Sequence, residues 1–299
     1  MPETTTAVEE IPVPGRESGP YGITTGSDGA LWFTLVHTGR IGRLEPGARE
    51  FTSYGLDAPG CGPTVITAGP DGALWFTRTH DHRIGRITTD GSPSELALPA
   101  PESGPYGITT GPDGALWFTE MNANRIGRMT LTGDVTHFPL PVQGAFPSAI
   151  TEGPDGALWF TMNQADAVAR ITTEGEITEF SLRKGAAPVG MAADRGGDAL
   201  WFTEIGADTV GRITTSGEIT EFPLPEPGSR PHAVVVDTAG VCWFTEWGAN
   251  RVGRISPDGT LTECDLPTPS CEPHGLTAGP DGAIWTALES GALARITVT

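Results

Sequence analysis

Imidazole and carboxylate groups gather near the C-terminal end of the chain, and such groups can hold a metal ion and move a proton. His232 and His274 each follow a proline, and they are two of only six histidines; Glu272 and Glu289 flank His274. Two carboxylates suit a hard divalent cation such as Mg²⁺ or Ca²⁺. An ordinary imidazole titrates at about 6.5, which suits a general base at neutral pH. Since no Ser or Cys recurs with a base at a recognisable nucleophile motif, metal-assisted proton abstraction or metal-activated water is favoured over covalent catalysis.

These residues belong to a repeat that runs through the whole chain. The segment Gly-Pro-Asp-Gly-Ala-Leu-Trp-Phe-Thr at residues 111–119 recurs with small changes, and its tryptophans are spaced by 43 residues once and then by 42 five times. Seven of the eight tryptophans therefore occupy one structural position, which we interpret as core. They are Trp32, Trp75, Trp117, Trp159, Trp201, Trp243 and Trp285.

Each repeat predicts four short strands. Residues 106–109 illustrate the first strand, residues 115–119 the second after a Pro-Asp-Gly turn, residues 83–88 the third, and residues 176–182 the fourth, which alternates with period two. Four strands per unit of about 40 residues are typical of β-propeller blades. The sequence thus predicts an all-β, seven-bladed β-propeller, with residues 1–299 forming a single domain.

The two ends of the sequence predict how the ring closes. The last unit stops at residues 294–299, after its third strand, whereas residues 7–14 have the pattern of a fourth strand. We expect this N-terminal strand to complete the last blade, which removes the exposed edges of an open array. A solenoid is the alternative, but it would need distinct caps, and none is evident. A closed ring needs no partner to cover its edges, so we expect a monomer.

Positions at which the repeat is broken are candidates for function. The first and second strands of a blade are antiparallel neighbours, so the start of the first strand lies beside the end of the second. Residues just before the first strand and just after the second therefore share one rim. At these places only blades six and seven carry His232, His274, the off-period Trp247 and the carboxylates Glu272 and Glu289. Tyr21 is expected to join them, because blade one follows blade seven in a closed ring.

Other polar residues are expected to be structural or superficial. His37 and His137 are interpreted as surface residues, and the loop at residues 80–82 has two histidines and an aspartate but no evident third metal ligand. Tyr106 shares the position of Tyr21 but belongs to blade three, so we expect it on the far side of a cleft. One repeated position of expected structural role holds Glu120, Glu204 and Glu246.

The composition excludes several classes of partner. The chain has 37 acidic and 18 basic residues and a formal charge of −19, which repels nucleic-acid phosphates and anionic lipids. No apolar run approaches the roughly 20 residues of a membrane span, and the N-terminus lacks the features of a signal peptide. We therefore expect a cytoplasmic protein with free thiols, although the sequence leaves open whether Cys264 and Cys271 pair.

Several segments carry a resemblance to a known family. Residues 18–24, 230–233, 243–250 and 272–275 are similar to those of virginiamycin B lyases, enzymes that inactivate streptogramin B antibiotics, and the likeness spans all seven units. The resemblance implies a Mg²⁺-dependent lyase that confers antibiotic resistance by linearising a cyclic depsipeptide through elimination at its ester bond. By position it implies Glu272 and Glu289 as metal ligands, His274 as general base, and His232, Tyr21 and Trp247 as substrate contacts. A metal-dependent lactone hydrolase and a non-catalytic binding module remain the alternatives.

Overall fold

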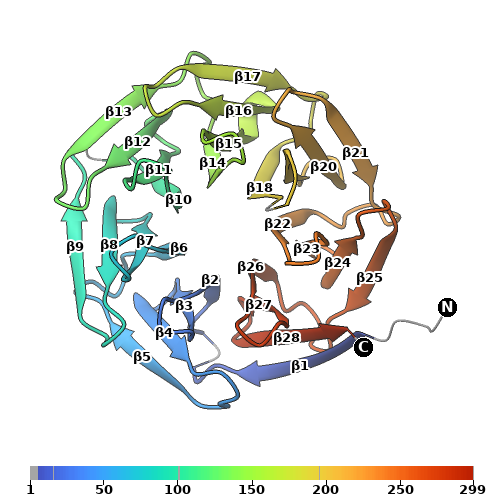
Figure 1. The fold of residues 1–299 in the computed structure, drawn as a ribbon. Coiled ribbons are helices and arrows are strands. Elements are labelled where there is room, and N and C mark those ends of the chain that lie inside the picture. Colours follow the sequence, from blue (N-terminus) through green and yellow to red (C-terminus); the bar gives the residue numbers. More distant parts are fainter. Residues whose placement is uncertain (1–5, 16, 100–101, 195, 299) are drawn as a thin grey trace.

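Seven four-stranded antiparallel sheets surround a central channel in the computed structural model, which describes all residues except 1–5, 16, 100–101, 195 and 299 (Figure 1). The predicted seven-bladed β-propeller is therefore confirmed. The part of the chain that the structure describes contains one helical element, a short 3₁₀ turn at Asn163–Ala165. Within the same residues, no helix is long and apolar enough to cross a membrane.

The strands follow the same order in every blade, from the channel outward. The first strands are β2 (Pro20–Thr25), β6 (Pro63–Ala68), β10 (Pro105–Thr110), β14 (Pro147–Glu152), β18 (Pro188–Ala193), β22 (Pro231–Val236) and β26 (Pro273–Ala278). The second strands are β3 (Leu31–Leu35), β7 (Leu74–Arg78), β11 (Leu116–Glu120), β15 (Leu158–Met162), β19 (Ala199–Glu204), β23 (Cys242–Glu246) and β27 (Ile284–Leu288). The third strands are β4 (Arg40–Leu44), β8 (Arg83–Ile87), β12 (Arg125–Met129), β16 (Ala167–Ile171), β20 (Thr209–Thr214), β24 (Arg251–Ile255) and β28 (Ala292–Val298). The outer strands are β5 (Phe51–Gly55), β9 (Pro93–Ala97), β13 (Val135–Pro139), β17 (Ile177–Ser181), β21 (Ile219–Pro223), β25 (Leu261–Asp265) and β1 (Thr6–Pro12).

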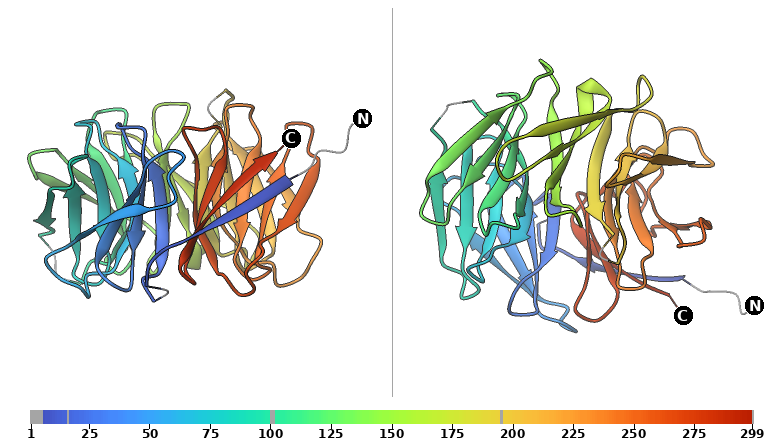
Figure 2. Two further views of the ribbon diagram at one scale, coloured as in Figure 1. Left: turned by 90° about the horizontal axis from the view of Figure 1, so that it is seen from below. Right: turned by 45° about the horizontal axis from the view of Figure 1, so that its top comes forward.

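Strand β1 closes the ring as the sequence predicts. It pairs antiparallel with β28 from Thr6 opposite Val298 to Pro12 opposite Ala292, so the last blade has the order β1-β28-β27-β26. Figure 2 shows β1 running beside β28 at the side of the ring. Both ends of the described chain thus belong to blade seven, which is followed in the ring by blade one.

The periodic tryptophans form the core between blades, and each is at most 5% exposed. In blade one, the Asp28 carboxylate accepts hydrogen bonds from the Trp32 indole at 3.1 Å and from Nε of Arg43 at 2.8 Å. The same bridge recurs through Asp71, Asp113, Asp155 and Asp281. The aspartate of the turn therefore ties the second strand of these blades to the third.

An open ring of buried threonines connects successive blades at the channel. These residues are Thr34, Thr77, Thr119, Thr161, Thr203 and Thr245, and none has exposed surface; blade seven has Ala287 at this position. In blades one to six, the hydroxyl donates to a backbone carbonyl of the next blade's first strand. Two of these carbonyls belong to His232, at 2.7 Å from Thr203, and to His274, at 3.1 Å from Thr245. The ring thus fixes the backbone beneath both histidines.

The start of each first strand lies beside the end of the second, as predicted. The backbone N–H of Trp247 donates to the carbonyl of Arg230 at 3.2 Å, and that of Glu289 donates to Glu272 at 3.1 Å. We call this edge of the propeller the site rim. All four cysteines are free, so Cys264 and Cys271 do not pair.

Candidate active site

His274 is the centre of the candidate site on the site rim. It lies at the start of β26, its side chain is 9% exposed, and its Nε2 is 2.5 Å from Oε2 of Glu289. This contact pairs Nε2 with the carboxylate, whereas Nδ1 of His274 has no hydrogen-bonding partner among the described residues. Buried polar atoms are normally paired, and an exception calls for a functional explanation. An imidazole in this state is suited to accept a proton from a ligand.

Glu289 joins two blades through its carboxylate. Its Oε2 faces His274 of its own blade, while its Oε1 is 2.9 Å from Nε2 of His37 in blade one. The contact with His274 lowers the pKa of Glu289, and His37 adds to this effect, although burial acts in the opposite direction. The carboxylate is therefore ionised at neutral pH. His37 is half exposed, as a surface residue should be, but its contact with Glu289 was not predicted.

Tyr21 covers one face of His274. The two rings stack with centroids 4.3 Å apart and planes inclined by 27°. The Tyr21 hydroxyl shares a hydrogen bond of 2.8 Å with the hydroxyl of Tyr106, which reaches it from blade three. Burial raises the pKa of Tyr21 well above its usual value, and Tyr106 adds to the shift, so the phenol stays protonated. Tyr106 therefore lines the same cavity as Tyr21 from blade three, and it also joins the cluster because the first strands converge at a narrow channel.

His232 forms the third side of this cluster. Its ring lies edge-on to His274 at 4.8 Å and to Tyr21 at 6.1 Å. Burial lowers the pKa of His232 to about 3, with a further contribution from His274. The imidazole is therefore neutral at physiological pH, and its buried Nδ1 has no partner among the residues that the structure describes. A neutral imidazole can exchange hydrogen bonds with a polar ligand without bringing a charge.

Trp247 and Glu272 lie beside this cluster in a cavity of their own. The cavity has a volume of about 390 Å³ and is also lined by Arg230, whose guanidinium stands 5.5 Å above the Trp247 ring. Glu272 is exposed, and its φ of 51° is in the left-handed region. Between the described residues, no ion pair or hydrogen bond connects its side chain to His274 or Glu289. The structure thus brings together four of the six predicted site residues and sets the other two next to them on the site rim.

The donor set of the rim fits Mg²⁺. In the described part of the chain, no three His, Cys, Asp or Glu side chains are assembled as ready ligands. Mg²⁺ does not require such a cage, because it keeps several waters and is commonly held by one or two carboxylates. Glu289 is ionised. Its backbone N–H is hydrogen-bonded to the carbonyl of Glu272, so the two glutamates are attached to the rim at neighbouring positions.

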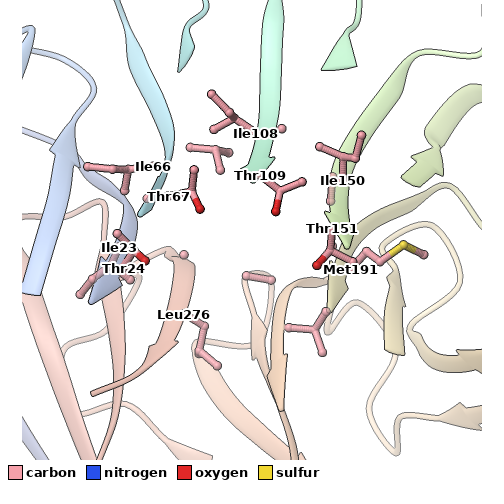
Figure 3. Close-up of a pocket in the computed structure, with 18 of the residues that line it drawn as sticks. Ile23, Thr24, Ile66, Thr67, Ile108, Thr109, Ile150, Thr151, Met191 and Leu276 are labelled. Atoms are coloured by element: carbon pink, nitrogen blue, oxygen red, sulfur yellow. The ribbon is translucent and has the colours of Figure 1, made fainter. Parts of the chain in front are cut away.

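The central channel beneath the cluster is lined by the first strands. Figure 3 shows side chains of Ile23, Ile66, Ile108, Ile150 and Leu276 around the channel, together with several threonines. The cavity has a volume of about 270 Å³, and Tyr21, Tyr106 and His232 line it at the site rim. A channel lined by both aliphatic and threonine side chains therefore lies directly under the cluster.

Comparison with known proteins assigns the family. The model of the virginiamycin B lyase family matches residues 6–296. A virginiamycin B lyase of Saccharopolyspora erythraea is 59% identical over 56 residues, which cover 19% of this chain and 18% of that protein. One of Streptomyces coelicolor is 55% identical over 42 residues, which cover 14% of each. These two alignments therefore span less than a fifth of the curated relatives.

Solved structures extend the similarity to the whole chain. A structure described as a streptogramin B lyase has a TM-score of 0.94 and 41% identity and covers 98% of both chains. A catalytically inactive His→Ala variant of the virginiamycin B lyase from Staphylococcus aureus, solved with quinupristin, has a TM-score of 0.94 and 43% identity. It covers 99% of this chain and 100% of its own. The chain belongs to the virginiamycin B lyase family.

Proposed function

We propose that this protein is a Mg²⁺-dependent carbon–oxygen lyase that linearises streptogramin B antibiotics by elimination at the ester bond, and that it thereby confers resistance. The observation that carries the proposal is the buried imidazole of His274, which lies between Tyr21 and an ionised Glu289 and whose Nδ1 has no hydrogen-bonding partner among the described residues. The family membership supports it, as does the relative that holds quinupristin and is inactivated by replacement of one histidine.

The proposed reaction adds no water. The imidazole of His274 takes the proton from the α-carbon of the threonine residue that carries the ester. The electron pair of that C–H bond forms a double bond to the β-carbon, the bond between the β-carbon and the ester oxygen breaks, and a carboxylate leaves. The product is a linear peptide with a dehydro residue and the same mass as the macrocycle.

The remaining site residues bind the substrate or the metal. The neutral His232 hydrogen-bonds a polar group of the substrate, while Tyr21 and Trp247 pack against the apolar rings of the macrocycle. Glu272 and Glu289 hold the metal. The C–H group next to a carbonyl is too weakly acidic for an imidazole alone to deprotonate it. When bound, Mg²⁺ would supply the electrophile that stabilises the negative charge developing on the carbonyl oxygen.

The test is mass spectrometry of quinupristin incubated with the purified protein, first with Mg²⁺ and then with EDTA. We expect a linear product of unchanged mass that forms only with the metal and is absent with His274→Ala. His80→Ala is the matched control, since His80 is exposed in blade two and makes no hydrogen bond or ion pair with the cluster among the described residues; it should retain full activity. A product that has gained one water would show that the protein is a lactone hydrolase and not a lyase. An intact macrocycle would favour a non-catalytic binding module.

Two expectations about the protein's state stay predictions. We infer a monomer, because β1 completes the last blade and the ring is closed without a partner chain. We also infer a cytoplasmic location from the sequence alone. Size-exclusion chromatography with light scattering tests the first, and cell fractionation tests the second.

A further inference from the structure

The carboxylate of Glu289 is held on both oxygens, and only one of its two partners belongs to the predicted site. Nε2 of His274 faces Oε2, and Nε2 of His37 lies 2.9 Å from Oε1. His37 comes from the loop after β3, whereas Glu289 follows β27, so this contact crosses from blade one to blade seven.

The loop of blade one fixes the ring of His37. The backbone N–H of His37 donates to the carbonyl of Ser18 at 3.2 Å, and that of Val36 donates to Gly19 at 2.9 Å. The imidazole packs on Gly19 so closely that a Cβ there would lie 2.7 Å from Nδ1. Because one side of the ring is against the backbone, Nε2 is left to meet the carboxylate.

Blades two and three show that this loop does not need an ion pair. His80 packs on Gly62 in the same way, with its Nδ1 2.5 Å from where a Cβ of that glycine would be, and Asn122 packs on Gly104. Among the described side chains, neither His80 nor Asn122 contacts a carboxylate. Asn122 also shows that this position does not require a histidine. The contact between His37 and Glu289 is therefore an addition to the repeat.

We propose that His37 is a positioning residue of the site: it holds Oε1 of Glu289 and so turns Oε2 toward His274 and toward the metal. This inference rests on the proposed function and deepens it. Residues that orient a metal ligand commonly change metal affinity by 10- to 100-fold when they are replaced. His37 itself touches neither substrate nor metal in this scheme.

The test compares His37→Ala and His37→Gln with the matched control His80→Ala. Calorimetric titration with Mg²⁺ alone should show affinity at least about 10-fold weaker for His37→Ala than for the unmodified protein. The His37→Gln variant should recover most of this loss, because its amide can still donate one hydrogen bond. With quinupristin, His37→Ala should lower kcat and leave KM unchanged, and His80→Ala should change neither quantity.

A second readout needs neither metal nor substrate. The ring nitrogen signals of His274, followed by NMR at one fixed pH, should move in His37→Ala and stay in place in His80→Ala, because only the first change releases Glu289. Unchanged His274 signals together with unchanged Mg²⁺ affinity would overturn the proposal, as would equal losses in both variants. If the metal affinity falls in His37→Ala but the unmodified protein does not cleave quinupristin, the role of His37 stands and the lyase proposal fails.

Discussion

Tyr21 lies almost flat on the imidazole of His274, with ring centroids 4.3 Å apart. Tyr21 comes from the first blade and His274 from the last, so the proposed base is covered by a residue from nearly the other end of the chain. The hydroxyl of Tyr21 is fixed in turn by Tyr106. The stacked phenol shields one face of the imidazole from water, which strengthens the electrostatic interactions of the site.

Removal of the Tyr106 hydroxyl should slow the reaction without unfolding the protein. A hydrogen bond of this kind is worth about 1 kcal/mol, so Tyr106→Phe should lower kcat by about 5- to 10-fold through a more mobile Tyr21. Tyr21→Ala should cost more, since it removes the whole stacked ring. The third tyrosine, Tyr54, stacks on Trp32 away from the site, and Tyr54→Phe is the control. Steady-state kinetics with quinupristin decide; equal rates for Tyr106→Phe and the unmodified protein would exclude this role.

His232 should remain neutral across the physiological range. Its pKa is lowered to about 3, whereas the unfolded chain takes up this proton at about 6.5. The unfolded state therefore binds more protons between these values, and His232 makes the free energy of unfolding fall as the pH drops through that window. The ring signals of His232 in NMR should not titrate between pH 5 and pH 8, and a titration in that range would contradict the assignment.

Glu246 should make the protein less stable in alkali. Burial raises its pKa to about 7, with Glu263 adding to the shift, and neither of its oxygens has a hydrogen-bonding partner among the described residues. The native state therefore binds more protons than the unfolded chain between about pH 4.5 and pH 7, so the free energy of unfolding falls as the pH rises through this window. Glu246→Gln should raise Tm at pH 8 and leave it nearly unchanged at pH 4. Glu120→Gln should instead lower Tm at pH 8, because Glu120 is paired with Arg125 at 2.5 and 3.0 Å.

Glu272 should reduce stability through its backbone conformation. Its φ is 51°, and blades one to three have glycine at the equivalent position. A non-glycine residue in this region costs about 1 kcal/mol, so Glu272→Gly should raise Tm by about 2 °C. The same variant should lose Mg²⁺-dependent activity. Ala187→Gly is the control, because Ala187 has φ of 46° but no role in the site; it should gain stability and keep activity. A lower Tm for Glu272→Gly in differential scanning calorimetry would be evidence against stored strain.

The repeat made the fold predictable, and departures from it made part of the site predictable. Trp and Gly at fixed spacing specify four strands per unit, so the number of blades and the role of β1 follow from the sequence alone. His232, His274 and Glu289 were found because they differ from the residues at equivalent positions. The sequence also placed Trp247 and Glu272 on the correct rim, but the structure sets them beside the cluster and not in it.

The contacts that were not predicted depend on distances between blades, which periodicity does not contain. Tyr106 is two blades from Tyr21, and only the narrowness of the channel lets their hydroxyls meet. His37 has a histidine counterpart in blade two, so its type alone gave no signal. The buried threonines gave no signal because they recur in six of the seven repeats, yet they fix the backbone of both site histidines.

The pairing of β1 with β28 has a consequence for biosynthesis. β1 leaves the ribosome first among the twenty-eight strands and must wait, unpaired, until β28 has been made. The stack of Tyr21 on His274 and the contact of His37 with Glu289 both join blade one to blade seven. They therefore form only after the final blade has docked. Contacts between residues so distant in the chain form slowly. A nascent chain with six finished blades would still lack His274 and Glu289, so the proposed drug inactivation would begin only once synthesis of the ring is complete.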